Sequence, residues 1–204
     1  MTQHVLRASG VLVHGRPLPL LPATDVELHT GEVRALVGEP GHAHTALALV
    51  LGGRLRPDAG AVTVDASVLD RSRQAAVALV DVPGVSEPDE KVPFGTVLGE
   101  ELAMAGQPAR RAAVRAWAPE APLARRTEDV PPAQRTELLL LAAALRSGVR
   151  FLVLTLPDRF GVTPGQWQPV AAGIARRGYG VLVTVGETSR HLLDVPATDI
   201  GGAQ

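Results

Sequence analysis

The sequence contains no cysteine, which excludes disulfide scaffolds and thiolate metal sites. Aromatic residues make up only 3% of the 204 residues and apolar residues 46%, so Val, Leu and Ala must fill the core. The apolar runs are far shorter than the roughly 18 residues that cross a bilayer. The amino-terminal segment has no pattern of an export signal. These absences predict a cytoplasmic protein that reaches a membrane only through a partner.

The sequence also has no excess of charge of either sign. Its 20 basic residues nearly balance its 21 acidic residues, which leaves a formal net charge of −1. Such a balance gives no overall field to attract nucleic acid or anionic lipid, so nucleic-acid binding is disfavoured. The arginine pairs at 110–111 and 125–126 are typical of a solvated surface, with partner binding as the alternative. The length predicts one domain over residues 1–204.

Short Val-rich segments predict strands that alternate with helices. The last two strands show little polar alternation, which indicates burial on both faces, as in a parallel sheet between helix layers. The predicted strands lie at 11–13, from Glu32, from Ala61, from Ala76, from Phe151 and from Gly180. Helices are predicted over 45–53, 134–148 and 166–177, and a helical lobe over about 83–133.

Residues 31–60 carry the most specific pattern of the chain. A Gly-Glu pair, an apolar strand, a glycine-containing loop, an apolar helix and a Pro-Asp-x-Gly turn follow one another. This order resembles the opening of the ATP-binding cassettes of ABC transporters, which belong to the P-loop NTPase superfamily. The positions in register are Gly31, Glu32, Gly38, Gly41, Thr45, Leu47, Gly52, Pro57, Asp58 and Gly60. The resemblance implies an α/β cassette fold with a mainly parallel sheet flanked by helices, an amino-terminal antiparallel β portion and a small inserted helical lobe.

The resemblance assigns a degenerate phosphate loop. In the family, loop N–H groups and the helix amino terminus hold phosphates, a lysine reaches the terminal ones and a hydroxyl holds magnesium. The positions that the resemblance gives to nucleotide binding are Gly38, Gly41, His44, Thr45 and, as a weak match to the adenine-stacking aromatic residue, His14. His44 replaces the lysine, and Thr45 keeps the hydroxyl. Any binding of ATP or ADP with magnesium is therefore expected to be weak.

Two substitutions set the size of this expected weakness. A charge-assisted contact is worth about 1.5–3 kcal/mol, and neutral histidine, with an ordinary pKa of about 6.5, cannot supply it at neutral pH. Glu39 adds repulsion, because a carboxylate about 6 Å from a phosphate charge costs on the order of 3 kcal/mol at an effective dielectric near 20. Together the two substitutions predict millimolar affinity or none.

The other family motifs are degenerate in parallel. At the signature segment LSGGQ the chain has Val130, followed by Pro131, Pro132, Ala133 and Gln134, and its prolines remove a backbone donor and fix the chain. The second acidic motif normally supplies a magnesium ligand and a water-positioning glutamate. Thr155 and Leu156 stand there, and neither can do that work. We therefore predict no catalytic residue.

Three more positions follow from the same register. Val82 stands at the family's lid glutamine and Gly186 at its switch histidine. Asp158 follows the second acidic motif but is expected to lie too far beyond the strand end to replace the lost acids. A metal site at His42, His44 and Glu39 is disfavoured, because the spacing is short and further ligands are not evident.

The resemblance therefore predicts a cassette that no longer hydrolyses ATP and acts by binding. The expected partner is a transmembrane ABC subunit, another cassette or a second copy of the chain, with the helical lobe as the docking surface. The first alternative is a slow or weak ATPase subunit, with His44 protonated by the phosphates. The second is a protein that binds another ligand in the reshaped pocket.

Overall fold

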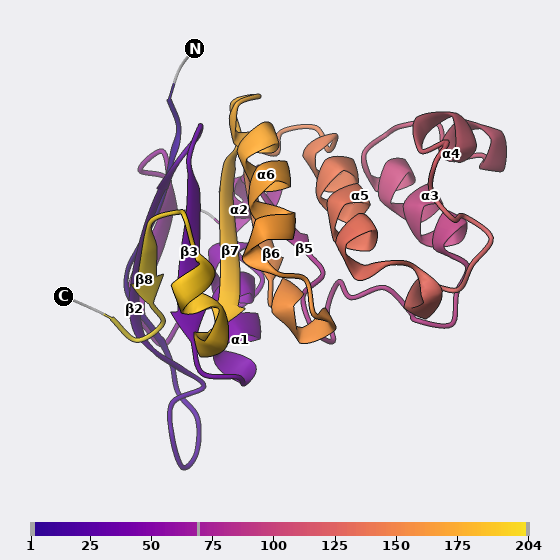
Figure 1. Cartoon of the computed structure of the whole chain (residues 1–204). Helices are drawn as coiled ribbons and strands as arrows, with labels where there is room; N and C mark the ends of the chain where they lie inside the picture. The colour runs from indigo at the N-terminus through magenta and orange to yellow at the C-terminus, as the bar shows by residue number, and fades with distance from the viewer. Residues whose placement is uncertain (1–2, 69, 203–204) are drawn as a thin grey trace.

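Two β-sheets lie side by side in the computed structural model, which describes residues 3–68 and 70–202 (Figure 1). One sheet is antiparallel with strand order β2-β1-β4, and the other is parallel with strand order β5-β6-β7-β3-β8. The strands are β1 (Val5–Val13), β2 (Leu21–His29), β3 (Val33–Gly38), β4 (Ala59–Val64), β5 (Val77–Val80), β6 (Phe151–Thr155), β7 (Gly180–Gly186) and β8 (Ala197–Asp199). The predicted parallel sheet and amino-terminal antiparallel portion are thereby confirmed.

Helices cover both faces of the parallel sheet. The α-helices are α1 (His42–Leu51), α2 (Asp70–Ala76), α3 (Phe94–Met104), α4 (Arg111–Trp117), α5 (Pro132–Ala144) and α6 (Pro164–Ala175), and the 3-10 helices are η1 (Thr127–Asp129), η2 (Pro157–Phe160) and η3 (Glu187–Leu192). In the part of the chain that the structure describes, no helix combines the length and the hydrophobicity that a membrane crossing requires.

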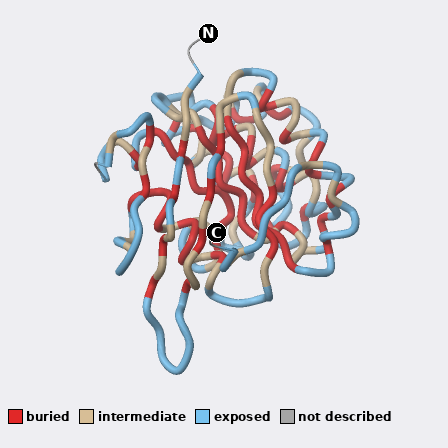
Figure 2. The backbone as a smooth tube through the Cα atoms, turned by 90° about the vertical axis from the view of Figure 1, so that its left-hand side faces the viewer, coloured by how far each residue is buried: buried red, intermediate tan, exposed pale blue. Residues whose placement is uncertain are grey.

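The core consists of two clusters, one on each face of the parallel sheet. Helix α1 packs between the two sheets, where Leu36, Leu47 and Leu182 are buried. On the opposite face, α5 and α6 cover the sheet, and Trp167 is the largest fully buried side chain. Strands β6 and β7 are buried at every residue, as their apolar runs predict. Figure 2 shows this buried centre and the exposed 14–20 loop that projects from it.

Helices α3 and α4 lie at the end of the molecule farthest from the antiparallel sheet (Figure 1). We call residues 94–129 the helical segment. The chain enters it after β5 and returns along α5, which packs against α3, α6 and the sheet. Prolines near the ends of the segment, rather than strand patterns, mark it in the sequence.

Three elements escape the prediction, and α1, α5 and α6 begin at His42, Pro132 and Pro164, each two or three residues before its predicted start. Strand β2 alternates buried and less buried residues as a half-buried antiparallel strand does, but Pro22 and two carboxylates conceal the pattern. Strand β8 is three exposed residues long, and α2 has only two buried residues. Helix α5 begins at Pro132 instead of Gln134, because proline is tolerated in the first helical turn, where N–H groups have no helical acceptor.

Candidate functional site

The loop between β3 and α1 lies at the carboxyl edge of the parallel sheet. Gly38 ends β3, Gly41 precedes α1, and Gly38 is the register partner of Gly186 at the end of β7. Strand β7 pairs with β6 on the side away from β3, so Thr155, the last residue of β6, lies at the same edge of the sheet. The fold therefore brings together the residues assigned to the phosphate loop, the second acidic motif and the switch position, as the carboxyl ends of neighbouring parallel strands require.

His44 fills the interior of this loop. Its side chain is fully buried, and its Nε2 lies 3.1 Å from the carbonyl oxygen of Glu39. This geometry fits an N–H donated from the ring to the loop's own backbone. Burial lowers the pKa of His44 below its ordinary value, against weaker opposing effects that include the charge of Asp158. His44 is therefore a neutral, inward-facing group at pH 7, whereas His42 on the same loop is exposed.

Thr45 is partly buried on the first turn of α1, and Glu39 is exposed on the loop. A cluster of three or more His, Asp or Glu side chains able to hold a metal ion is absent from residues 3–68 and 70–202. The retained hydroxyl at Thr45 therefore stands without a group of acidic ligands around it.

Thr155 and Leu156 occupy the end of β6. The Thr155 hydroxyl is fully buried, and its Oγ1 has no hydrogen-bond partner among the described residues. Its register partner Thr184 on β7 is in the same condition. Leu156 takes a left-handed backbone conformation, with φ at 49°, and donates its N–H to the Thr184 carbonyl at 2.8 Å. Neither side chain carries a charge that could bind magnesium or orient water.

Asp158 reaches the switch position from η2. Its Oδ2 accepts the Gly186 backbone N–H at 2.7 Å and the Ser189 hydroxyl at 2.9 Å. Asp158 lies beyond the end of β6, and its Oδ2 bonds these donors rather than lying beside Thr155. This contact was not foreseen, since 28 residues separate Asp158 from Gly186.

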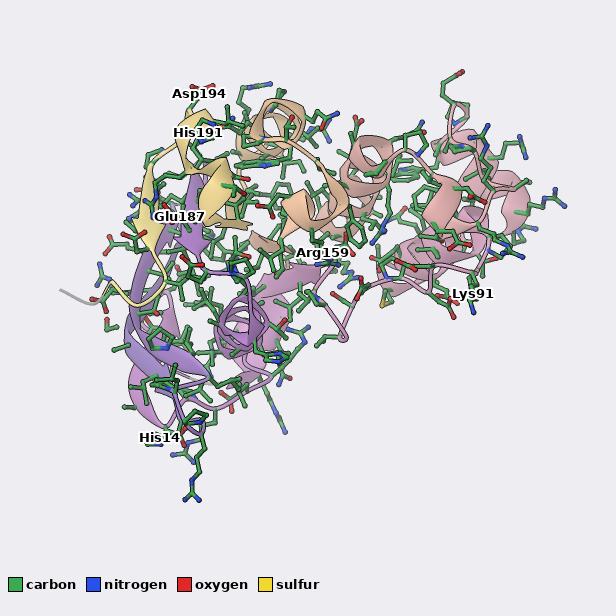
Figure 3. All side chains as sticks on the ribbon, turned by 60° about the horizontal axis from the view of Figure 1, so that its bottom comes forward. His14, Lys91, Arg159, Glu187, His191 and Asp194 are labelled. Carbon is green, nitrogen blue, oxygen red and sulfur yellow. The ribbon has the colours of Figure 1, made fainter. Side chains whose placement is uncertain are left out.

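The remaining predicted residues lie on other parts of the molecule. His14 is on the 14–20 loop, where its backbone N–H donates to Asp58 Oδ2 at 2.7 Å and its side chain is 77% exposed. Figure 3 shows His14 at the end of the molecule opposite the helical segment. Val82 is fully buried just after β5. Pro131 is the amino-terminal cap residue of α5, and Gln134 donates to the Glu120 carbonyl at 3.3 Å.

Comparison with known proteins places this fold. No protein-family model matches the chain. A ribose import ATP-binding protein of Rhizobium etli is 30% identical over 170 residues, which cover 77% of this chain and 33% of that protein. A solved ABC transporter ATP-binding protein from Pyrococcus furiosus superposes with a TM-score of 0.67 at 16% identity, covering 98% of this chain and 99% of that one. The chain has the fold of an ABC ATP-binding cassette.

A second relative matches a shorter part of the cassette. An arabinose import ATP-binding protein of Burkholderia ambifaria is 35% identical over 86 residues, or 41% of the cassette and 17% of that protein. The cassette thus spans about a third or less of the length of these curated relatives. The α/β cassette fold and the relationship to ABC ATP-binding proteins confirm the resemblance.

Proposed function

We propose that this cassette does not hydrolyse ATP and acts by binding a membrane subunit of a transporter or another cassette. We take residues 1–204 as a single cassette domain with a helical lobe over about 83–133. The relatives are named as ATP-binding proteins of sugar import. The transport setting is carried over from those names, whereas the loss of hydrolysis rests on this chain's own residues.

The observation that carries the proposal is the inward-facing His44. A cation at this position should extend toward the phosphates, but the ring is fully buried and hydrogen-bonded to the loop carbonyl of Glu39. Its lowered pKa opposes the charged form on which the slow-ATPase alternative depends. Thr155 and Leu156 supply neither a magnesium ligand nor a base. These residues do not fit a magnesium–ATP complex undergoing hydrolysis.

Docking is supported by a groove of about 470 Å³ between the sheet and α3. Val85 and Met104 on its wall are 48% and 58% exposed. Arg54 also lines the groove and has no carboxylate within ion-pair distance in the described ranges. Burial and the nearby charge of Arg146 lower the Arg54 pKa, which indicates a cation short of compensation. Apolar side chains beside such a cation suit a partner segment that places a carboxylate at Arg54, and the Asp89 and Glu100 carboxylates of the same lining favour a basic group elsewhere on that segment.

Calorimetry with magnesium and ATP tests the loss of hydrolysis, together with phosphate release. The wild-type cassette should show no saturable heat up to about 1 mM ATP. A variant combining His44→Lys, Thr155→Asp and Leu156→Glu should gain affinity because it restores the missing charges. The matched control carries His42→Lys in place of His44→Lys, which adds the same charge at an exposed position of the same loop.

Brisk phosphate release from the wild-type protein that disappears with Thr45→Ala would overturn the proposal. Micromolar ATP binding that tightens below pH 6.5 would favour the slow-ATPase alternative instead. Saturable thermal stabilisation by a non-nucleotide compound, which Glu39→Ala or Thr45→Ala removes, would favour a different ligand in the reshaped pocket.

The docking part is tested by co-purification of the tagged cassette from membranes of its source cells. A membrane permease should be recovered with the wild-type protein and lost with Arg54→Glu. The matched control is Arg56→Glu, which reverses an exposed charge outside the groove lining. Equal recovery with both variants would contradict docking in the groove.

A further inference from the structure

A buried ionic network lies where the chain leaves and re-enters the parallel sheet. Asp81 immediately follows β5, and its carboxylate is 1% exposed. Its Oδ1 accepts hydrogen bonds from Arg135 at 2.7 Å and from Arg159 at 3.0 Å. Arg159 also contacts Glu87 Oε1 at 3.1 Å. Two guanidinium groups therefore converge on one carboxylate oxygen, and one of them continues to a second acid.

Phe160 adds a packing contact to the same group. The Arg135 guanidinium lies 4.1 Å and the Arg159 guanidinium 4.4 Å from the centroid of its ring. Both distances lie within the roughly 6 Å over which a cation is attracted to an aromatic face. The ring thus restricts both arginines to the orientation in which they meet Asp81.

The four charged residues lie on three stretches of chain that meet at this junction. Asp81 ends the strand from which the chain departs, Glu87 lies on the outgoing loop, and Arg135 lies on the returning helix α5. Arg159 belongs to η2 after β6 and also donates to the backbone carbonyls of Asp81 and Thr155, each at 2.9 Å. Figure 3 shows Arg159 between the sheets and the part of the molecule that carries Lys91.

The network fixes the geometry of this junction more than it stabilises the folded protein. Burying an ion pair costs desolvation that the attraction within the pair only partly returns. Burial raises the pKa of Asp81, although Arg135 and Arg159 oppose the shift. Asp81 also holds a left-handed backbone conformation, with φ at 54°, which is uncommon outside glycine. Directional bonds from two fixed guanidinium groups define this strained turn more sharply than apolar contacts of equal volume.

We propose that the Asp81–Arg135–Arg159–Glu87 network is a clamp that fixes the helical segment in one orientation relative to the parallel sheet. The clamp holds both the outgoing loop, through Glu87, and the returning helix, through Arg135, so it fixes the two stretches of chain from which the segment is suspended. This inference goes beyond the proposed function and does not depend on which partner binds.

The clamp also shapes the groove beside it. Glu87 belongs to both, and the loop from Val85 to Val92 forms a wall of the groove. The N–H groups of Val85 and Glu87 donate to the Val82 carbonyl at 3.0 and 3.1 Å, which holds the start of this loop as a compact turn. Fixing Glu87 therefore holds this wall of the groove in place.

The clamp can be tested by a distance measurement between two spin labels. The chain lacks cysteine, so Arg115→Cys on α4 and Arg177→Cys after α6 give two unique labelling sites, both exposed. In the wild-type background we expect one narrow distance distribution. Asp81→Asn keeps the shape of the side chain and removes its charge, and it should broaden or split the distribution. Native-state hydrogen exchange at Val85 and Glu87 should accelerate about a hundredfold.

Two further variants keep the test decisive. Arg159→Met removes the less buried arginine, whose side chain is 20% exposed, and leaves the Asp81–Arg135 pair in place if Asp81→Asn does not fold. Arg190→Met is the matched control, because it breaks contacts with Glu187 and Asp199 on the surface and should leave the distribution narrow. A distribution that stays narrow in a cooperatively folded Asp81→Asn or Arg159→Met protein overturns the proposal. A broad distribution in the wild-type protein does so as well.

Discussion

Acidification should destabilise the folded protein through His44, and this prediction tests whether the loop imidazole is neutral. The ring is fully buried, and its Nε2 geometry fits donation to the Glu39 carbonyl, so the folded state takes up a proton less readily than the unfolded chain. Burial lowers the His44 pKa in the folded state, whereas in the unfolded chain it titrates near its ordinary value of about 6.5. The stabilising contribution is therefore present above about pH 6.5 and is lost as the pH falls toward the folded-state pKa.

The magnitude follows from proton linkage. When one proton binds only to the unfolded state, the free energy of unfolding changes with pH by up to about 1.4 kcal/mol per pH unit. Between pH 7.5 and 5.5 the free energy of unfolding should drop by about 1.4 kcal/mol, if His44 stays unprotonated in the fold over that range. The drop becomes smaller if the folded-state pKa lies inside the range.

Urea denaturation across this pH range measures the effect against a His44→Gln variant. Glutamine does not titrate, and its amide can donate to the Glu39 carbonyl in place of the ring. The difference between the two pH profiles isolates His44 from the other titrating groups. Parallel profiles would refute the argument, as would a wild-type protein that gains stability relative to the variant in acid, because a protonated His44 would then be favoured by the fold.

Three further predictions concern the surroundings of the loop and the core. Asp158→Ala should lower the free energy of unfolding by about 1–3 kcal/mol, because the Gly186 N–H and the Ser189 hydroxyl lose their acceptor, and Ser189→Ala should cost less in the same urea titration. Trp167→Ala should lower the free energy of unfolding by about 3–5 kcal/mol, because it leaves a cavity beneath α6. Trp167→Phe should lower it less, because the indole Nε1 has no described hydrogen-bond partner to lose, and thermal unfolding compares the two variants. In the variant with restored charges, Glu39→Ala should tighten ATP binding by at most about tenfold, since the carboxylate is exposed and screened, and unchanged calorimetric affinity would remove Glu39 from the account.

The architecture was predictable because its determinants are local. Apolar runs such as Phe151–Thr155 indicate a strand buried on both faces, and the glycine-containing loop before an apolar helix identifies the edge at which a site can form. Strand β2 was missed because a half-buried strand interrupted by Pro22 shows only weak alternation. The loop's general position followed from the sequence, but the direction in which the His44 ring points did not, since backbone geometry decides it.

The charged network was missed because its contacts are far apart in sequence. Asp81 lies 54 residues before Arg135 and 78 before Arg159, and nothing in the local pattern pairs them. One signal was present: a carboxylate that directly follows a fully apolar strand is expected to be buried, and a buried carboxylate needs a cationic partner. The sequence contains many arginines and does not show which of them is that partner. Only the fold, which brings Asp81, Arg135 and Arg159 together, identifies it.

The residues at positions 44, 155 and 156 are compatible with the cassette fold, and the structure gives a physical reason. A phosphate loop carries backbone polar groups that a ligand normally helps to satisfy, and leaving such groups unpaired is costly. Here the cassette supplies its own partners: the His44 ring faces the Glu39 carbonyl, and the Asp158 carboxylate accepts the Gly186 N–H. Each internal contact stabilises the ligand-free fold, and each occupies a donor, the His44 ring N–H or the Gly186 N–H, that a bound phosphate would need as a hydrogen-bond partner. Returning the lysine alone should therefore recover less binding than the variant that also changes Thr155 and Leu156, because Asp158 would still hold the Gly186 N–H and no carboxylate would bind magnesium.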